Sequence, residues 1–140
     1  MKELIHVADF LQMSKLQVRN WIALLESEMS SLPQLEIPLK HYFSKGVYAR
    51  EISIKAGSLI VGKIHRHKNM NILTKGYVSV LSTDGVVKLK APCSPFVASA
   101  GVKRVIYAHE DSVWLTIHGT HETDLEKIEN EFIAQSYEEV

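Results

Sequence analysis

The spacing of apolar residues divides the chain into helical ends and a middle of short strands. Near the N-terminus, apolar side chains recur every three or four positions over residues 3–30, which predicts an amphipathic helical region. Ser14 is a suitable N-cap, so we expect a break near Gln12–Ser14 and a second helical segment after it. Ser31-Leu32-Pro33 ends the region, because proline disfavours helix in the residue before it.

Between Val47 and His118 the pattern changes to short runs rich in Val, Ile, Tyr and Thr, separated by glycine, proline or aspartate. About eight strands at roughly ten-residue spacing are typical of a β-barrel or sandwich. Asp84-Gly85 is the strongest hairpin signal, since both residue types tolerate positive φ. The expected strands are Tyr48–Ile54, Leu59–His65, Asn71–Thr74, Tyr77–Leu81, Val86–Lys90, Phe96–Ala98, Arg104–Ala108 and Val113–His118.

The C-terminal end returns to helical spacing. Thr123-Asp124-Leu125-Glu126 matches a capping box, in which the Thr and Glu side chains each satisfy an unpaired backbone N–H group. The apolar side chains that follow form a stripe that can lie on the barrel: Leu125, Ile128, Phe132 and Ile133.

Length and composition restrict the class of protein. The 140 residues suit one ordinary domain, and the 46% apolar content lets it bury one core. The single cysteine, Cys93, excludes a disulfide within the chain and a cysteine-based zinc cluster. With no signal-like apolar stretch at the start and no apolar run of membrane-spanning length, we expect a cytoplasmic protein without a membrane partner. The expected organisation is a helical extension (1–36), a β-barrel (37–121) and a C-terminal helix with an acidic tail (122–140).

The net charge of zero hides an asymmetry. Residues 41–121 carry eleven Lys or Arg against four acids, whereas residues 122–140 carry seven acids against Lys127 alone. Such a basic body with an acidic tail has two interpretations, and the sequence leaves both open. The two halves neutralise each other on a solvated surface or between subunits, or the basic body binds an anion.

The segment Gly62-Lys63-Ile64-His65-Arg66-His67 carries the candidate chemistry. Side chains at positions i and i+2 of a strand share a face, so His65 and His67 can point into the barrel together. Two neutral imidazoles at this spacing are a common half-site for Zn, Fe, Mn or Ni.

This glycine-bounded strand, the pair of histidines and a second strand that closes on Lys75-Gly76 resemble the first motif of the cupin superfamily, and residues 98–108 resemble its second motif. The resemblance covers residues 37–121 and implies a mainly β fold with a single cupin-type (jelly-roll) barrel. Three stretches are also similar to small uncharacterised cupin-like proteins of bacteriophages: Gly46-Val47-Tyr48-Ala49-Arg50-Glu51, Gly62-Lys63-Ile64-His65 and Val113-Trp114-Leu115-Thr116-Ile117-His118. This resemblance implies that the chain works in the cytoplasm of a host.

The chain departs from the pattern of metal-binding cupins. Those proteins place a glutamate shortly after the histidine pair, where this chain has Asn69 and Asn71. In the second motif, the positions of the family's proline, histidine and asparagine hold Ser99, Arg104 and Ala108. A cation at the third ligand position opposes a metal ion by Coulomb repulsion.

The resemblance therefore carries His65 and His67 across as metal ligands, without a carboxylate or a third histidine. His109 or His118 would have to complete the site, and neither is supplied by the motifs. A divalent metal cofactor is accordingly disfavoured.

The same positions suit an anionic ligand. Arginine offers a planar fork of donors that matches phosphate or carboxylate at two points. In the alternative interpretation, Arg104 pairs with Glu110 or Asp111 and the histidines are satisfied polar residues. Tyr48 and Arg50 alternate in the first expected strand and can line the barrel mouth or form an edge contact. The expected ligand-binding residues are Lys63, His65, His67, Asn71 and Arg104.

These features favour a non-enzymatic, homo-oligomeric binding module whose basic cavity holds a phosphorylated or nucleotide-like molecule. The bacteriophage resemblance adds sequestration of a host defence signal as a role. The alternative is a metal-dependent cupin enzyme, such as an isomerase or dioxygenase, that uses His65 and His67. A third interpretation starts from residues 7–22, which resemble a helix-turn-helix, but the slightly acidic residues 1–40 are unsuited to gripping DNA. We therefore expect no nucleic-acid partner.

Overall fold

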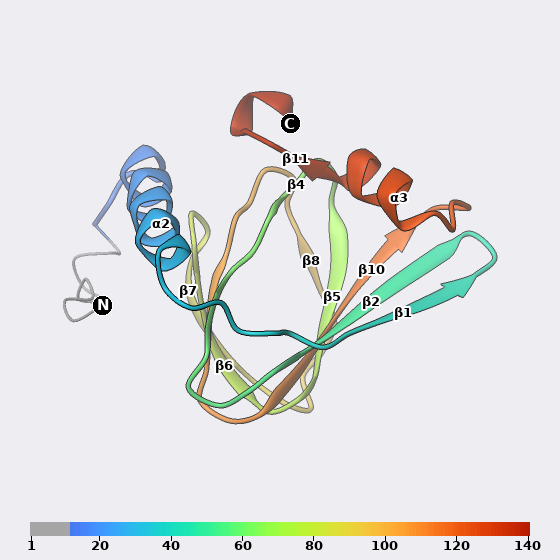
Figure 1. Cartoon of the computed structure of the whole chain (residues 1–140), viewed down its shortest axis with the longest axis horizontal. Coiled ribbons are helices and arrows are strands. Elements are labelled where there is room, and N and C mark those ends of the chain that lie inside the picture. Colours follow the sequence, from blue (N-terminus) through green and yellow to red (C-terminus); the bar gives the residue numbers. More distant parts are fainter. Residues whose placement is uncertain (1–11) are drawn as a thin grey trace.

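The protein consists of two facing antiparallel sheets with a helix on either side, as shown by a computed structural model that describes residues 12–140 (Figure 1). The larger sheet has five strands in the order β1-β2-β10-β5-β8, and the smaller has four in the order β3-β9-β6-β7. The expectation of a mainly β, jelly-roll barrel with a helix at each end is confirmed.

The five-stranded sheet supplies one wall of the barrel. Its central strand, β10, pairs antiparallel with both β2 and β5. Trp114, Thr116 and His118 of β10 are buried and face into the barrel, whereas the residues between them face outward. The strands are β1 (Leu39–Ser44), β2 (Val47–Ile54), β5 (Asn69–Lys75), β8 (Phe96–Ala98) and β10 (Ser112–Gly119).

The four-stranded sheet supplies the opposite wall. Its β6–β7 hairpin turns at the Asp84-Gly85 pair that the sequence indicated, and Gly85 adopts a φ of 114°, which an L-residue rarely reaches. The strands are β3 (Leu59–Val61), β6 (Tyr77–Ser82), β7 (Gly85–Lys90) and β9 (Val105–Ala108).

An apolar core fills one end of the space between the sheets. Leu73, Val78 and Ala108 are fully buried there, and they come from both walls. Because each strand alternates, every second residue from both sheets reaches this core. The remaining members of the cluster are Ile54, Val80, Ile106 and Trp114.

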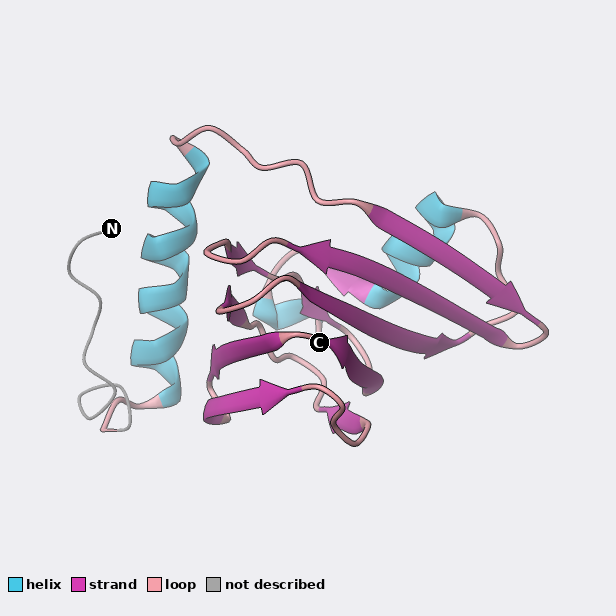
Figure 2. Ribbon diagram, turned by 90° about the horizontal axis from the view of Figure 1, so that it is seen from below, coloured by secondary structure: helices cyan, strands magenta, loops and turns pink. Residues whose placement is uncertain are grey.

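Helix α2 (Lys15–Ser30) packs on the outside of the four-stranded sheet, away from α3 (Figure 2). Its buried residues Val18, Ile22 and Leu25 contact Val105 of that sheet. The expected cap is confirmed, because the Ser14 hydroxyl accepts a hydrogen bond from the backbone N–H of Gln17. The first part of the expected helical region, and part of the helix-turn-helix segment 7–22, lies outside the described residues.

Helix α3 (Leu125–Phe132) lies over the end of the barrel that is opposite the apolar core. We call this end the mouth of the barrel. The predicted capping box at Thr123 is wrong, because Asp124 is the N-cap and its carboxylate accepts hydrogen bonds from Glu126 and Lys127. Asp caps a helix as well as Thr does, so a shift of one residue has little energetic cost. In the described part of the chain, neither helix is long and apolar enough to cross a membrane.

The expected strand Leu59–His65 is interrupted at Gly62 and Lys63. Its first part, β3, pairs with β9, whereas β4 (Ile64–His65) pairs with a two-residue strand, β11 (Ile133–Ala134), at the C-terminal end. The last turn, η1 (Tyr137–Glu139), is tied back by an ion pair of 2.9 Å between Arg66 and Glu139. Strands β1 and β11 were not expected from the sequence, and both border the mouth of the barrel.

Candidate ligand-binding site

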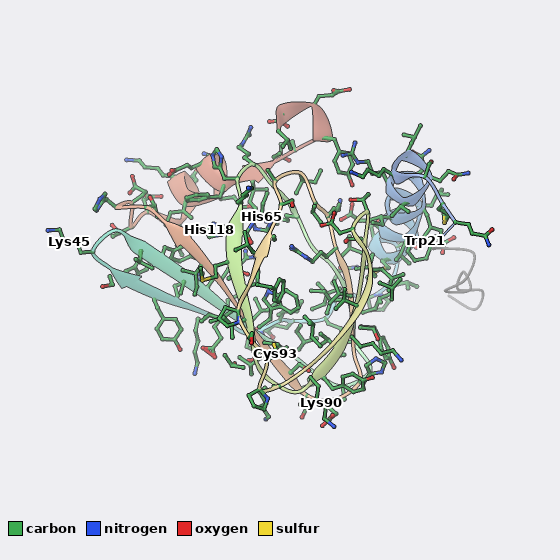
Figure 3. The ribbon with its side chains drawn as sticks, turned by 180° about the vertical axis from the view of Figure 1, so that it is seen from behind. Trp21, Lys45, His65, Lys90, Cys93 and His118 are labelled. Carbon is green, nitrogen blue, oxygen red and sulfur yellow. The ribbon has the colours of Figure 1, made fainter. Side chains whose placement is uncertain are left out.

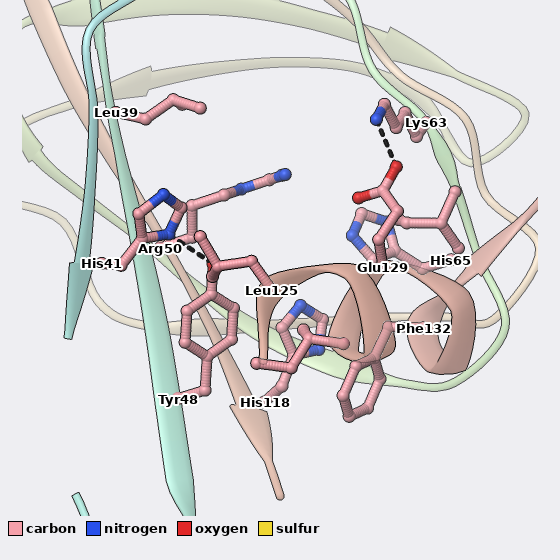
Figure 4. A pocket seen from close by; sticks show the side chains of 12 residues that line it. Leu39, His41, Tyr48, Arg50, Lys63, His65, His118, Leu125, Glu129 and Phe132 are labelled. Atoms are coloured by element: carbon pink, nitrogen blue, oxygen red, sulfur yellow. Dashed lines mark hydrogen bonds and ion pairs between the residues drawn. The ribbon is translucent and has the colours of Figure 1, made fainter. Parts of the chain in front are cut away.

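A pocket of about 230 Å³ lies at the mouth of the barrel, between the β1–β2 hairpin, β4, β10 and α3 (Figure 4). We call it the mouth pocket. Its polar lining comes from His41, Tyr48, Arg50, Lys63, His65, His118 and Glu129, and its apolar lining from Leu39, Leu125, Ile128, Phe132 and Ile133.

Strand register explains why these side chains meet. His41 of β1 lies directly opposite Arg50 of β2, and Tyr48 lies directly opposite His118 of β10. Opposite residues in an antiparallel pair share a face of the sheet. His65 lies on β4, which belongs to neither large sheet and pairs with β11, where His65 is opposite Ile133. Four separate strands therefore carry the polar groups to one point.

His65 and His118 stack on each other inside the mouth, with ring centroids 5.5 Å apart and an interplanar angle of 24° (Figure 3). His118 also stacks on Phe132 of α3, with ring centroids 4.3 Å apart. Each histidine exposes only 7% of its surface. Nevertheless, both ring nitrogens of His65 and Nδ1 of His118 lack a hydrogen-bond partner. Buried polar atoms without partners are costly, so these nitrogens are suited to a ligand.

Both imidazoles are neutral at physiological pH. Burial lowers the pKa of His65 to about 4, helped by the neighbouring His118 and by the positive charges of Arg50 and Arg104. The nearby carbonyl of Lys63 opposes this shift without making a geometrically acceptable hydrogen bond. Burial and Arg50 likewise lower the pKa of His118 to about 4. A neutral imidazole presents one N–H donor and one bare acceptor nitrogen.

Arg50 is the cation that reaches furthest into the mouth pocket (Figure 4). Within residues 12–140 its guanidinium forms no ion pair. Tyr48 and Arg50 were expected either at the mouth or at an edge, and both line the mouth. Arg50 was nevertheless absent from the expected ligand-binding set. The only signal for it was its two-residue spacing from Tyr48.

Lys63 and Glu129 form an ion pair at the rim of the mouth pocket. Their side chains are 58% and 39% exposed, so the pair is largely solvated. Such exposed pairs contribute little to stability. Glu129 thus supplies the only carboxylate among the lining residues and neutralises one of their cations.

The structure separates the expected pair of histidines. β4 ends at His65, so the strand alternation does not continue to His67. His67 is exposed and meets the edge of the Phe132 ring, and its charge helps to lower the pKa of His118. Lys63 and His65 do line the mouth pocket, whereas His67, Asn71 and Arg104 do not.

Arg104 acts on the site from outside the mouth pocket. Its charge lowers the pKa of His65, which places it within electrostatic reach of that ring. Burial lowers the pKa of Arg104 itself, and the charge of Asp84 opposes this effect. Among the described residues, the ion pair with Glu110 or Asp111 that the alternative interpretation expected is not formed.

Asn71 has a fully buried position below the mouth pocket. Its side-chain oxygen accepts hydrogen bonds from Trp114 Nε1 at 2.9 Å and Thr116 Oγ1 at 3.0 Å. Its amide nitrogen donates to Asn69 Oδ1 at 2.7 Å. The donors and acceptors of Asn71 are therefore used within the protein, and the residue organises the interior beneath the site.

The described residues do not fit a bound metal ion. No group of three or more His, Cys, Asp or Glu side chains in residues 12–140 is arranged to hold one. The stacked rings of His65 and His118 supply two imidazoles, and among the described residues no further His, Cys, Asp or Glu is arranged with them as a third ligand. The charges of Arg50 and Arg104 add repulsion toward a cation.

No family model and no curated protein sequence matches the chain, but many solved structures share its fold. A cupin superfamily protein from Desulfitobacterium hafniense has 13% identity and a TM-score of 0.52, with 63% of this chain and 81% of that chain covered. KdgF from Halomonas sp. has 19% identity and a TM-score of 0.53, with 67% of this chain and 88% of that chain covered.

An acetylacetone dioxygenase from Acinetobacter johnsonii has 21% identity and a TM-score of 0.50, with 63% of this chain and 66% of that chain covered. Identities this low relate the folds of these proteins and not their activities. By its sheet order, its core and these structural neighbours, the chain has the cupin-type jelly-roll fold.

Proposed function

We propose that the chain is a binding protein that holds a small, hydroxyl-bearing anion in the mouth pocket. One observation carries the proposal. Two buried, neutral imidazoles direct unpaired ring nitrogens into a pocket that also receives the unpaired guanidinium of Arg50.

The charge of the mouth pocket favours an anion. Arg50 and Lys63 are cationic, Glu129 is the single acid in the lining, and Arg104 adds a positive field from outside it. An arginine makes two parallel charge-assisted hydrogen bonds to phosphate or carboxylate, and these are stronger than neutral ones. We therefore assign to Arg50 the role of principal anion contact, and to Arg104 a supporting electrostatic role.

The histidines narrow the chemical class of the ligand. His65 leaves both an N–H and a bare nitrogen without a partner, so a complementary ligand must accept one hydrogen bond and donate another. Phosphate or carboxylate oxygens accept, and a hydroxyl group donates. Sugar phosphates, hydroxy acids and nucleotides combine the two.

The volume of the mouth pocket limits the size of the ligand. At about 230 Å³ it is smaller than the ~300–1,000 Å³ typical of drug-sized sites, so it suits a ligand of the size of a sugar phosphate, or the phosphorylated end of a nucleotide. The resemblance to bacteriophage proteins extends the proposal to a nucleotide-derived signal of the host, which a test panel should include.

The test is calorimetric titration of the full chain at pH 7 with ribose 5-phosphate, inorganic phosphate, ribose and a nucleoside monophosphate. We expect at least one phosphorylated sugar to bind more tightly than inorganic phosphate, and ribose not to bind. Arg50→Gln should weaken that binding about 10- to 100-fold, the effect of losing hydrogen bonds to a charged group.

Lys45→Gln is the matched control, because it removes a cation from the same hairpin outside the mouth pocket. It should leave affinity unchanged. The proposal is overturned if no anion of the panel binds, or if Arg50→Gln binds as the parent chain does. Stoichiometric Zn, Fe, Mn or Ni in the purified protein would instead support the metal-dependent enzyme.

A further inference from the structure

The two stacked histidines of the mouth pocket are enclosed by the protein. Both ring nitrogens of His65 and Nδ1 of His118 are buried, and none of the three has a hydrogen-bond partner. A ligand that binds these nitrogens has to displace whatever covers them. Part of the wall of the mouth pocket must therefore move when a ligand enters or leaves.

The C-terminal end of the chain forms much of the cover. We call residues 125–140 the C-terminal strap, which runs from α3 through β11 to η1 across the mouth of the barrel (Figure 1). Its Phe132 stacks on His118, and its Ile133 lies opposite His65. The strap also contributes three further residues to the pocket lining: Leu125, Ile128 and Glu129.

The sheet wall of the mouth pocket is fixed more firmly than the strap. β10 pairs with β2 at eight positions and with β5 along its other edge. In the strap, β11 pairs with β4 at two positions. Segments with short ladders open at a lower free energy than the central strands of a sheet do. This difference identifies the strap as the movable part of the wall.

Side-chain hydrogen bonds from Arg66 add to this short ladder. The guanidinium donates to Ile133 O at 3.1 Å, to Glu139 O at 3.2 Å and to Glu139 Oε1 at 2.9 Å. The backbone N–H of Arg66 donates to Phe132 O at 2.8 Å. Arg66 follows β4 directly, so one residue ties both the middle and the end of the strap to the body of the protein.

Glu139 receives this guanidinium and closes the end of the strap on itself. Its Oε2 accepts hydrogen bonds from the backbone N–H groups of Gln135 and Ser136, at 2.7 and 2.9 Å. One carboxylate therefore orders the turn between β11 and η1. A second tie to the body lies at Tyr137, because the Arg19 guanidinium of α2 lies 4.1 Å from the centre of its ring.

We infer that the C-terminal strap is a gate over the mouth pocket and that Arg66 holds it closed. The ligand enters when the contacts of Arg66 break, and the strap then closes over it with Phe132 and Ile133. This role rests on the proposed function, because it requires that the buried nitrogens receive a ligand. Arg66 is a positioning residue, since it acts through the strap and does not line the mouth pocket.

Carbethoxylation of histidines by diethyl pyrocarbonate tests the gate without any ligand. The reagent modifies neutral, accessible imidazoles, and tandem mass spectrometry reports each histidine separately. In the parent chain, His65 and His118 should react much more slowly than the exposed His109. Arg66→Gln should speed the reaction of both buried histidines about 10-fold, because opening then breaks one charge-assisted hydrogen bond fewer. The rate at His109 should not change.

Lys103→Gln is the matched control, because it removes the cation of a different ion pair, with Glu26 of α2, outside the strap. It should leave the rates at both buried histidines as they are in the parent chain. Glu139→Gln removes the charge with which Arg66 pairs and should have the same effect as Arg66→Gln. It takes the place of that variant if Arg66→Gln fails to fold.

Hydrogen exchange separates opening of the gate from general unfolding. In Arg66→Gln the backbone amides of the strap should exchange faster, whereas those of β10 should keep the parent rates. The inference is overturned if His65 of the parent chain reacts as fast as His109, or if a folded Arg66→Gln variant reacts as the parent does. Equal acceleration of exchange in β10 and in the strap overturns it too. None of these measurements uses an anion, so their outcome is independent of whether the proposed ligand binds.

Discussion

The two ends of the barrel interior are built from the same strands but have opposite chemistry. Along β10, Trp114 belongs to the apolar core, Thr116 joins the Asn71 network, and His118 reaches the mouth pocket. Figure 3 shows His65 and His118 near the end beneath α3, with Cys93 toward the other end. The end that holds the apolar core, which we call the closed end, therefore stabilises the fold. The mouth instead leaves polar atoms unpaired for a ligand.

The difference shows where this protein concentrates its stability. At the closed end, aliphatic side chains from both sheets exclude water. At the mouth, the buried imidazoles of His65 and His118 oppose folding, because each must stay neutral beside positive charge and has ring nitrogens without a partner. Substitutions at the closed end should mainly change stability, and those at the mouth mainly binding. Four predictions test this division.

The largest effect is expected at the closed end. Leu73 is completely buried in the core, so Leu73→Ala should lower the free energy of unfolding by about 4 kcal/mol through lost burial and a residual cavity. Urea unfolding measures this change. Leu24→Ala, on the exposed side of α2, is the matched control and should change stability by less than ~0.5 kcal/mol. Equal losses of stability in Leu73→Ala and Leu24→Ala would show that the apolar core at the closed end does not stabilise the fold.

Acid should destabilise the mouth end. Burial and Arg50 lower the pKa of His118 from 6.5 to about 4, so the unfolded chain binds more protons between these values. Stability is therefore lost as pH falls through this window, by about 3 kcal/mol for this ring. Urea unfolding at several pH values should show this loss, and His118→Gln should reduce its slope. An identical pH dependence in both proteins would contradict the assignment.

A substitution at the boundary between the two ends, where Asn71 lies, should have an intermediate effect on stability. Asn71→Ala leaves the Trp114 indole N–H and the Thr116 hydroxyl without their shared acceptor. We expect thermal unfolding to report a loss of about 1–3 kcal/mol, the cost of unpaired buried polar groups. Asn130→Ala, at an exposed position of α3, controls for the amide itself and should be nearly neutral. A neutral Asn71→Ala would show that the network does not stabilise the interior.

The smallest effect is expected at the rim. Glu129→Gln removes the only carboxylate of the mouth pocket and releases Lys63, so anion affinity should rise a few-fold. Stability should change by less than ~1 kcal/mol, because the pair is largely exposed. Calorimetric titration with ribose 5-phosphate measures the affinity, and Glu131→Gln on the same helix should leave it unchanged. Weaker binding by Glu129→Gln would mean that the carboxylate itself contacts the ligand.

Much of the fold could be predicted from the sequence because its signals are local. The Ser14 cap, the Asp84-Gly85 turn and the alternating runs depend on neighbouring residues alone. Strand β11 could not be predicted, because two residues carry no periodicity and only the pairing with β4 makes Ile133–Ala134 a strand. Thr123 was predicted as the N-cap because Thr123 and Glu126 have the spacing of a capping box, but the adjacent Asp124 can cap a helix as well and does so.

The candidate site was less accessible to sequence reasoning. The i and i+2 rule for His65 and His67 requires a strand that continues, and β4 ends at His65. His65 instead meets His118, which lies 53 positions later in the sequence. Arg50 joins them because β2 pairs with β10 in one register.

The sequence by itself determined the mainly β architecture, the helix at each end and the excess of cations in the barrel, since composition and short-range periodicity encode these properties. Only the tertiary structure decided which imidazoles stack and which guanidinium enters the mouth pocket. Those outcomes depend on register between strands distant in sequence, and a shift of one residue would turn every side chain to the opposite face.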